Sequence, residues 1–123
     1  MNVLIVEDDI LLQKVMSIEL RILGLPLRFA ESGQDALERI KEQVPSVLVL
    51  DVRLPDMSGF DLIEQLRKNS TTMGLPLIIH TSIDLTADES ERLTLGPTRI
   101  ITKTRPGSDI LANVIRELID ELV

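Results

Sequence analysis

The sequence contains no cysteine, no tryptophan and no tyrosine, and its only aromatic residues are Phe29 and Phe60. The lack of cysteine excludes disulfide bonds, thiolate zinc sites and cysteine nucleophiles, and it suits a reducing cytoplasm. Basic residues are also few, with 13 Lys and Arg against 20 Asp and Glu, which gives a formal net charge of −7. Because such a chain repels nucleic-acid phosphates, we expect no direct binding of nucleic acid.

Long hydrophobic runs are missing as well. The apolar run near the start, Val3-Leu4-Ile5-Val6, is too short for the core of a signal peptide and has no basic residues before it. No run approaches the roughly 20 apolar residues of a membrane span. We therefore expect a cytoplasmic protein with no membrane partner.

Short apolar runs alternate five times with amphipathic stretches along the 123 residues. The expected strands are Val3–Val6, Leu27–Ala30, Val47–Leu50, Leu77–Ile79 and Arg99–Thr102. Most are continuously apolar, which is typical of parallel strands that are covered on both faces. Five βα units with short loops predict one α/β domain over residues 1–123, a doubly wound five-stranded parallel sheet with five helices.

The expected helices are recognised by apolar residues at helical spacing and by their end signals. The first carries Leu11, Val15, Ile18 and Ile22 on one face and ends near Gly24. The others are Gln34–Gln43, with Leu37, Ile40 and Val44 on one face; a helix capped by Ser58, with Leu62, Ile63 and Leu66 inward; Ala87–Leu95; and Ser108–Leu122, with Leu111, Val114, Ile115, Leu118 and Leu122 on one face.

Polar residues follow four of the five strands, at the edge of the sheet where functional groups gather in this fold class. They are Glu7 and Asp8 after the first strand, Asp51 after the third, Thr81 after the fourth and Lys103 after the fifth. Carboxylates, a hydroxyl and one ammonium suit a Mg²⁺ site beside a phosphoryl acceptor. A carboxylate can attack phosphorus, and a metal ion together with lysine can then neutralise the phosphoryl oxygens.

Each residue alone also has an ordinary structural interpretation. Asp9 is best explained as a helix N-cap, Thr81 as a strand-end hydroxyl that caps the backbone, and His80 as a residue that packs or hydrogen-bonds locally. Glu7, Asp51 and Lys103 have similar explanations when they are taken one at a time. The combination at four strand ends carries the functional prediction.

The chain resembles the response-regulator receiver domains of two-component signalling over essentially its whole length. The resemblance rests on Leu4–Asp9, on the stretch Asp51–Gly59 that matches the family pattern D-x-x-[ML]-P-x-M-x-G, on Thr81-Ser82 and on Lys103. It implies the flavodoxin-like strand order 2-1-3-4-5.

The resemblance also implies a role for each site residue. Asp51 is then the phosphoacceptor, and Lys103 and Thr81 contact the phosphoryl group. The cofactor is Mg²⁺, bound by Asp8, by Asp51 and by the backbone carbonyl of Arg53, with Glu7 holding a metal-bound water. The domain would catalyse its own phosphorylation and dephosphorylation without being an enzyme in the usual sense.

Two residues depart from the family pattern. Ile100 stands where the family usually has an aromatic switch residue, which argues against aromatic toggling. Thr104 follows Lys103 where the family usually has proline, often after a cis bond. Since a cis bond without proline costs about 3 kcal/mol, we expect this bond to be trans or else strained.

The implied partners are a sensor histidine kinase or a histidine phosphotransfer protein, and a second copy or an output domain at the surface of Ala87–Leu95, Arg99–Thr102 and Ser108–Leu122. The alternative is a receiver-like interaction module that is not phosphorylated. A phosphatase or dehalogenase with an aspartyl intermediate ranks last, because it needs a general acid at position 53, where Arg53 stands.

Overall fold

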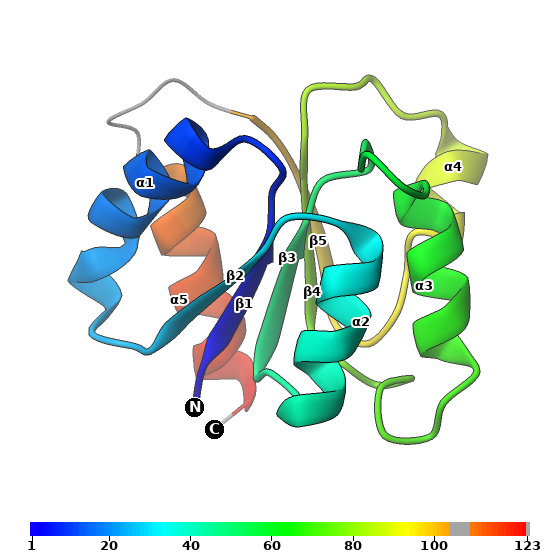
Figure 1. The fold of residues 1–123 in the computed structure, drawn as a ribbon, viewed down its shortest axis with the longest axis horizontal. Helices are drawn as coiled ribbons and strands as arrows, with labels where there is room; N and C mark the ends of the chain where they lie inside the picture. Colours follow the sequence, from blue (N-terminus) through cyan, green and yellow to red (C-terminus); the bar gives the residue numbers. More distant parts are fainter. Residues whose placement is uncertain (104–108, 123) are drawn as a thin grey trace.

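Five strands form one sheet in the computed structural model, which describes residues 1–103 and 109–122 (Figure 1). The strands are β1 (Val3–Val6), β2 (Leu27–Ala30), β3 (Val47–Leu50), β4 (Leu77–Thr81) and β5 (Thr98–Thr102). All four neighbouring pairs are parallel, and the order is β2-β1-β3-β4-β5. The predicted fold class and strand order are confirmed.

The strand sequences explain their positions. Every residue of β1, β3 and β4 is buried, as expected for apolar strands in the middle of a sheet that is covered on both faces, whereas β2 and β5 form the partly exposed edges. The first three strands have the predicted bounds. Strand β4 extends two residues further than predicted, because the β4–β5 ladder continues through polar residues to the pair Thr81 and Thr102. Strand β5 begins one residue earlier, because Thr98 pairs with Leu77.

Helices cover both faces of the sheet (Figure 1). One face carries α1 (Ile10–Glu19), which continues into the 3₁₀ turn η1 (Leu20–Leu23), and α5 (Ile110–Leu122). The other carries α2 (Gly33–Glu42), α3 (Gly59–Arg67) and α4 (Ala87–Arg92). Each face has its own hydrophobic core. Among the described residues, no helix is long and apolar enough to cross a membrane.

The face of α1 and η1 that packs on the sheet is not the apolar face that the sequence pattern indicated. Leu11, Ile18 and Ile22 do share a face, but they are 73%, 63% and 72% exposed. The face that packs on the sheet carries Met16 and Leu20, with Leu12 and Leu23 partly buried beside them. Both faces are apolar at helical spacing, so the periodicity alone did not distinguish them.

Two helix ends also differ from the predictions, and one residue of α5 is more exposed than its place in the pattern indicates. Helix α2 ends at Glu42 because Gln43 is extended, so Val44 lies beyond the helix and is 44% exposed. Helix α4 ends at Arg92, because Leu93 turns into the core and is fully buried. In α5, Leu111, Ile115 and Leu118 are buried as predicted, whereas Leu122 is 41% exposed.

The predicted caps Ser58 and Asp9 are confirmed. The Ser58 side chain accepts a hydrogen bond from the Asp61 N–H, and the Asp9 side chain accepts from Leu11 and Leu12. The predictions for the start of the last helix at Ser108 and for the peptide bond before Thr104 lie outside the described residues.

Candidate functional site

The predicted site residues lie at the carboxyl ends of the strands, at one edge of the sheet. Glu7 follows β1, Asp51 follows β3, Thr81 ends β4 and Lys103 follows β5. Because β1, β3, β4 and β5 are consecutive neighbours in a parallel sheet, their carboxyl ends come together. The sheet therefore collects residues that are far apart in the sequence.

The Lys103 ammonium joins the two acidic strand ends. Its Nζ lies 2.6 Å from Asp51 Oδ2 and donates a hydrogen bond of 2.9 Å to Glu7 Oε1. The side chains of Glu7 and Asp51 are only 3% and 10% exposed, and that of Lys103 is 22% exposed. Two nearly buried carboxylates thus share one ammonium group, and the pocket favours the binding of cations.

Burial changes the acid–base behaviour of this group. Burial raises the pKa of Glu7, and a hydrogen bond with the Asp8 side chain also raises it, while contacts with Lys103 and the Asp9 N–H oppose the change. Burial by itself would lower the pKa of Lys103, but the hydrogen bonds with Asp51 and Glu7 outweigh it and the pKa is raised. Lys103 is therefore a firmly protonated cation.

Asp8 and Asp9, the next two residues, have different environments. Asp8 is exposed at the rim of the site, close enough to Glu7 for the two carboxyl groups to interact. The Asp9 N–H donates to Glu7 Oε2 at 3.1 Å, while the Asp9 side chain caps α1. The start of α1 therefore fixes the orientation of Glu7.

The loop between β3 and α3 holds Asp51 and Arg53. The Arg53 N–H donates to Asp51 Oδ1 at 3.2 Å, so the two carboxylate oxygens of Asp51 have different partners, this N–H and the Lys103 ammonium. The base of the loop is closed by a 2.7 Å hydrogen bond from the Gly59 N–H to the Val52 carbonyl. A Cβ at position 59 would lie 2.9 Å from the Val52 Cα, so only glycine fits this close approach.

Thr81 is buried at the end of β4. Its hydroxyl accepts a hydrogen bond of 3.3 Å from the Ile83 N–H, and its carbonyl accepts one of 2.9 Å from the Lys103 N–H. The second bond fixes the start of the Lys103 segment beside β4. A pocket of about 160 Å³ separates Thr81 from Ile100, which is 41% exposed on β5.

The donor chemistry of the site fits a hard divalent cation. Glu7 and Asp51 already hold one positive group between them, and Asp8 lies beside Glu7. In the part of the chain that the structure describes, no three acidic or histidine side chains form a ready-made metal cluster. Mg²⁺ does not require one, because it usually takes one or two carboxylates and completes its shell with water and phosphate oxygens.

Two residues beside the site had no predicted functional role. His80 follows Ile79, which pairs with Leu50 of β3, and it lies close enough to Asp51 for the two side chains to interact electrostatically. It is 7% exposed, and its Nε2 has no hydrogen-bond partner among the described residues. Burial and the nearby Lys103 lower the pKa of His80 to about 4. The predicted packing is confirmed, but the predicted local hydrogen bond is not made by Nε2. The other residue, Asp56, accepts hydrogen bonds from the backbone at the start of α2. A single acidic residue within a loop motif does not predict such a contact.

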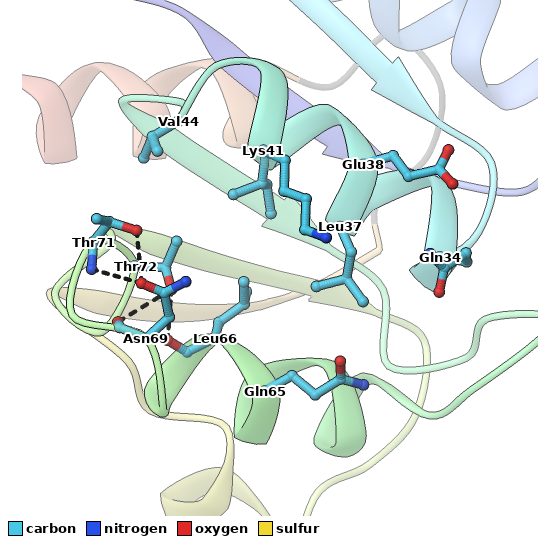
Figure 2. Close-up of a pocket in the computed structure, with 11 residues that line it drawn as sticks. Gln34, Leu37, Glu38, Lys41, Val44, Gln65, Leu66, Asn69, Thr71 and Thr72 are labelled. Atoms are coloured by element: carbon cyan, nitrogen blue, oxygen red, sulfur yellow. Dashed lines mark hydrogen bonds between the residues drawn. The ribbon is translucent and has the colours of Figure 1, made fainter.

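The described surface also has a hollow away from this site. A groove of about 680 Å³ runs between α2 and α3, and Figure 2 shows Leu37 and Lys41 of α2 facing Gln65 and Leu66 of α3 across it. It contains none of the predicted site residues. The groove therefore lies apart from the candidate site, which rests on the chemistry of its side chains.

Comparisons with known proteins agree with this geometry. A family model described as the response regulator receiver domain matches residues 3–115. The chain is 39% identical over 102 residues to a probable transcriptional regulatory protein, TcrX, of Mycobacterium tuberculosis, covering 83% of this chain and 43% of that protein. It is 29% identical over 114 residues to the transcriptional regulatory protein PhoP of Escherichia coli, covering 93% of this chain and 50% of that protein.

Among solved structures, the receiver domain of a Francisella response regulator matches with a TM-score of 0.82 at 27% identity, over 99% of this chain and 98% of that one. The chain spans half or less of the length of the two curated relatives named above.

Proposed function

This chain belongs to the response regulator receiver domain family of two-component systems, and on that premise we propose that Asp51 accepts a phosphoryl group from a phosphohistidine partner. The observation that carries the proposal is the pairing of the Asp51 carboxylate with the Lys103 ammonium at 2.6 Å. This contact places a fixed positive charge where the oxygens of an incoming phosphoryl group must be neutralised.

The reaction is a direct transfer between two side chains. An Asp51 carboxylate oxygen attacks phosphorus in line with the phosphorus–nitrogen bond of phosphohistidine. A phosphorus–oxygen bond forms and the phosphorus–nitrogen bond breaks, and its electron pair stays on the ring nitrogen. The other ring nitrogen of the reacting phosphohistidine carries a proton, so the ring leaves as neutral imidazole. Lys103 neutralises charge on the transferred group, and the buried Thr81 hydroxyl, one strand away, hydrogen-bonds to it after a local rearrangement.

We assign Mg²⁺ as the cation of this site. Asp8, Asp51 and the backbone carbonyl of Arg53 would hold it, with Glu7 acting through a bound water. When bound, Mg²⁺ supplies positive charge to the phosphoryl oxygens. This assignment is supported by oxygen donors of the right kind around a pocket that already holds one positive group.

Phosphorylation would act as a switch of surface shape. The new charge draws Thr81 and Lys103 toward the phosphoryl group, and the loops after β3 and β4 follow. Helix α4 is suited to respond, because it has only six residues and none of them is buried. The surface formed by α4, β5 and α5 is the one we assign to a second copy or to an output domain, with Ile100 exposed at its centre in place of an aromatic residue.

The phosphodonor, a sensor histidine kinase or a histidine phosphotransfer protein in the cytoplasm, requires a docking surface beside Asp51. The exposed apolar face of α1 and η1, formed by Leu11, Ile18 and Ile22, begins next to the acidic residues at the end of β1. Single exposed apolar residues are ordinary, but a row of them along one helix is typical of a contact surface. We assign this face to the phosphodonor.

The central test uses a small-molecule phosphodonor. We expect acetyl phosphate with Mg²⁺ to add one phosphoryl group to the wild type, detected by intact mass, and none to Asp51→Asn. Asp61→Asn, which makes the same change at an exposed position on α3, should be labelled like the wild type. No labelling of the wild type, or equal labelling of Asp51→Asn, contradicts the proposal.

The second candidate is a receiver-like interaction module that is never phosphorylated. It is favoured by the exposed Ile100 in the place of an aromatic switch. The same experiment separates the candidates when it is combined with a Mg²⁺ titration followed by NMR. An interaction module of this kind shows neither labelling nor cation binding at Glu7, Asp8 and Asp51.

A further inference from the structure

The loop that carries Asp51 and Arg53 is fastened at its far end to a different helix. Asp56, near the tip of this loop, accepts two hydrogen bonds from backbone N–H groups at the start of α2. Its Oδ1 accepts from Gly33 at 2.8 Å and its Oδ2 accepts from Gln34 at 2.9 Å. One carboxylate thus binds the first two residues of α2 from 23 and 22 positions away in the sequence.

These contacts complete the cap of α2. The side chain of the N-cap residue Ser32 accepts a hydrogen bond from the Asp35 N–H at 3.0 Å, while the N–H groups of Gly33 and Gln34 donate to Asp56. A carboxylate at this position is favoured both by the charge-assisted hydrogen bonds and by the positive end of the helix dipole. The hydrogen bonds from Gln34 and Gly33 accordingly lower the pKa of Asp56, so it is ionised at neutral pH.

The next residue of the loop packs against the same point. A Cβ at position 33 would lie 2.4 Å from Cγ and 2.5 Å from Sδ of Met57. The Met57 side chain therefore occupies the space that any other residue at position 33 would fill. Glycine begins α2 because the loop tip lies directly on it.

At its base the loop is equally constrained. Arg53 pairs with Ser58 in an isolated antiparallel bridge, and the Gly59 N–H donates to the Val52 carbonyl. The segment between Asp51 and Gly59 is therefore held at both ends: the base is closed on itself and the tip is attached to α2. Only two residues of this closed loop separate Arg53 from Asp56.

We propose that Asp56 is a positioning residue of the phosphorylation site, which fastens the Asp51–Gly59 loop to α2 so that cation binding at the site and the start of α2 are coupled. The inference rests on the proposed function, because it assigns the Arg53 carbonyl to the cation. The coupling is reciprocal: a cation that orders the loop strengthens the contact with Gly33 and Gln34, and loss of that contact weakens cation binding.

The test is a titration of the whole chain with Mg²⁺ alone, followed by ¹H–¹⁵N NMR. In the wild type, we expect the Gly33 and Gln34 amide signals to shift with the same Kd as the Asp51 signal. In Asp56→Ala, we expect the Kd for Mg²⁺ to rise about tenfold, as for other residues that support metal ligands. The matched control Asp61→Ala removes a carboxylate from the first turn of α3 and should leave the Kd unchanged.

Asp56→Asn provides a second test in case the alanine variant does not fold. Asparagine keeps one neutral acceptor, so its Kd should lie between those of the wild type and Asp56→Ala. If either variant is folded and binds Mg²⁺ like the wild type, or if the Gly33 and Gln34 signals do not respond in the wild type, the positioning role is overturned and the proposed function stands. A wild type that binds no Mg²⁺ overturns both.

Discussion

Nζ of Lys103 lies 2.9 Å from Oε1 of Glu7, although 96 positions separate the two residues in the sequence. The same ammonium lies 2.6 Å from Asp51. These contacts join β1, β3 and the end of β5 at one point of the sheet. The proposed acceptance of a phosphoryl group by Asp51 depends on the positive charge at this point.

Replacing Lys103 with alanine should slow phosphorylation of Asp51 about 100-fold, the usual order for losing one group that stabilises transition-state charge. The carboxylates remain, so Mg²⁺ binding should persist. The measurement is the initial rate of labelling by phosphoramidate with Mg²⁺. Lys68→Ala, which removes an exposed lysine at the end of α3, is the control and should keep the wild-type rate. A Lys103→Ala rate within twofold of the wild type would refute the assigned role.

Stability should depend on pH through His80. Its pKa is lowered from 6.5 to about 4, so between these values the unfolded state binds a proton that the folded state does not. The unfolding free energy is therefore not reduced by His80 above pH 6.5, and it decreases as the pH falls from 6.5 toward 4. We expect a loss of about 2 kcal/mol, somewhat below the full linkage value because water near the site screens the charge.

The measurement is urea unfolding of the wild type and of His80→Leu from pH 7.5 to 4. The difference in unfolding free energy should grow in favour of the variant as the pH falls. At pH 7.5 the variant should already be more stable, by about 1 kcal/mol, because leucine removes the unpartnered Nε2 from the core. A difference that does not change with pH would show that His80 is protonated equally in both states.

Two glycine substitutions should have opposite consequences. Gly59→Ala places a Cβ 2.9 Å from the Val52 Cα and 3.3 Å from the Asp51 carbonyl oxygen, and should cost about 1–3 kcal/mol of unfolding free energy and slow phosphorylation. At Gly74 nothing lies within 4 Å of the added Cβ, so Gly74→Ala should be neutral or stabilise the protein by up to about 1 kcal/mol. Thermal unfolding and labelling by acetyl phosphate measure both effects. Equal behaviour of the two variants would contradict the close contact at Gly59.

The orientation of α1 gives another comparison. Met16 is 2% exposed, so Met16→Ala should lower the unfolding free energy by about 2–5 kcal/mol. Ile18 is 63% exposed, so Ile18→Ala should change it by no more than about 0.5 kcal/mol, while slowing phosphotransfer from the cognate kinase if this face docks the donor. Urea unfolding measures the first effect, and a kinase assay measures the second. If Ile18→Ala lowered the unfolding free energy more than Met16→Ala, the face that carries Ile18 would be the one that packs on the sheet.

The sequence by itself determined the strand cores and which polar residues meet at the carboxyl ends of the strands. Continuous runs such as Val47–Leu50 have one stable environment, between two layers of helices, and a polar residue at the end of such a run necessarily lies at the edge of the sheet. The sequence therefore predicted that Asp51 and Lys103 lie close together, because the topology alone brings the ends of parallel strands together.

Only the tertiary structure decided which of two apolar faces α1 buries, since Ile18 and Met16 both satisfy the helical period and the choice depends on how α1 lies against the sheet. It also decided the contact of Asp56 with Gly33 and the environment of His80. A sequence shows which chemical groups a chain carries. Hydrogen bonds between distant segments and the exclusion of water depend on the packing of the whole molecule, and a local sequence pattern does not contain that information.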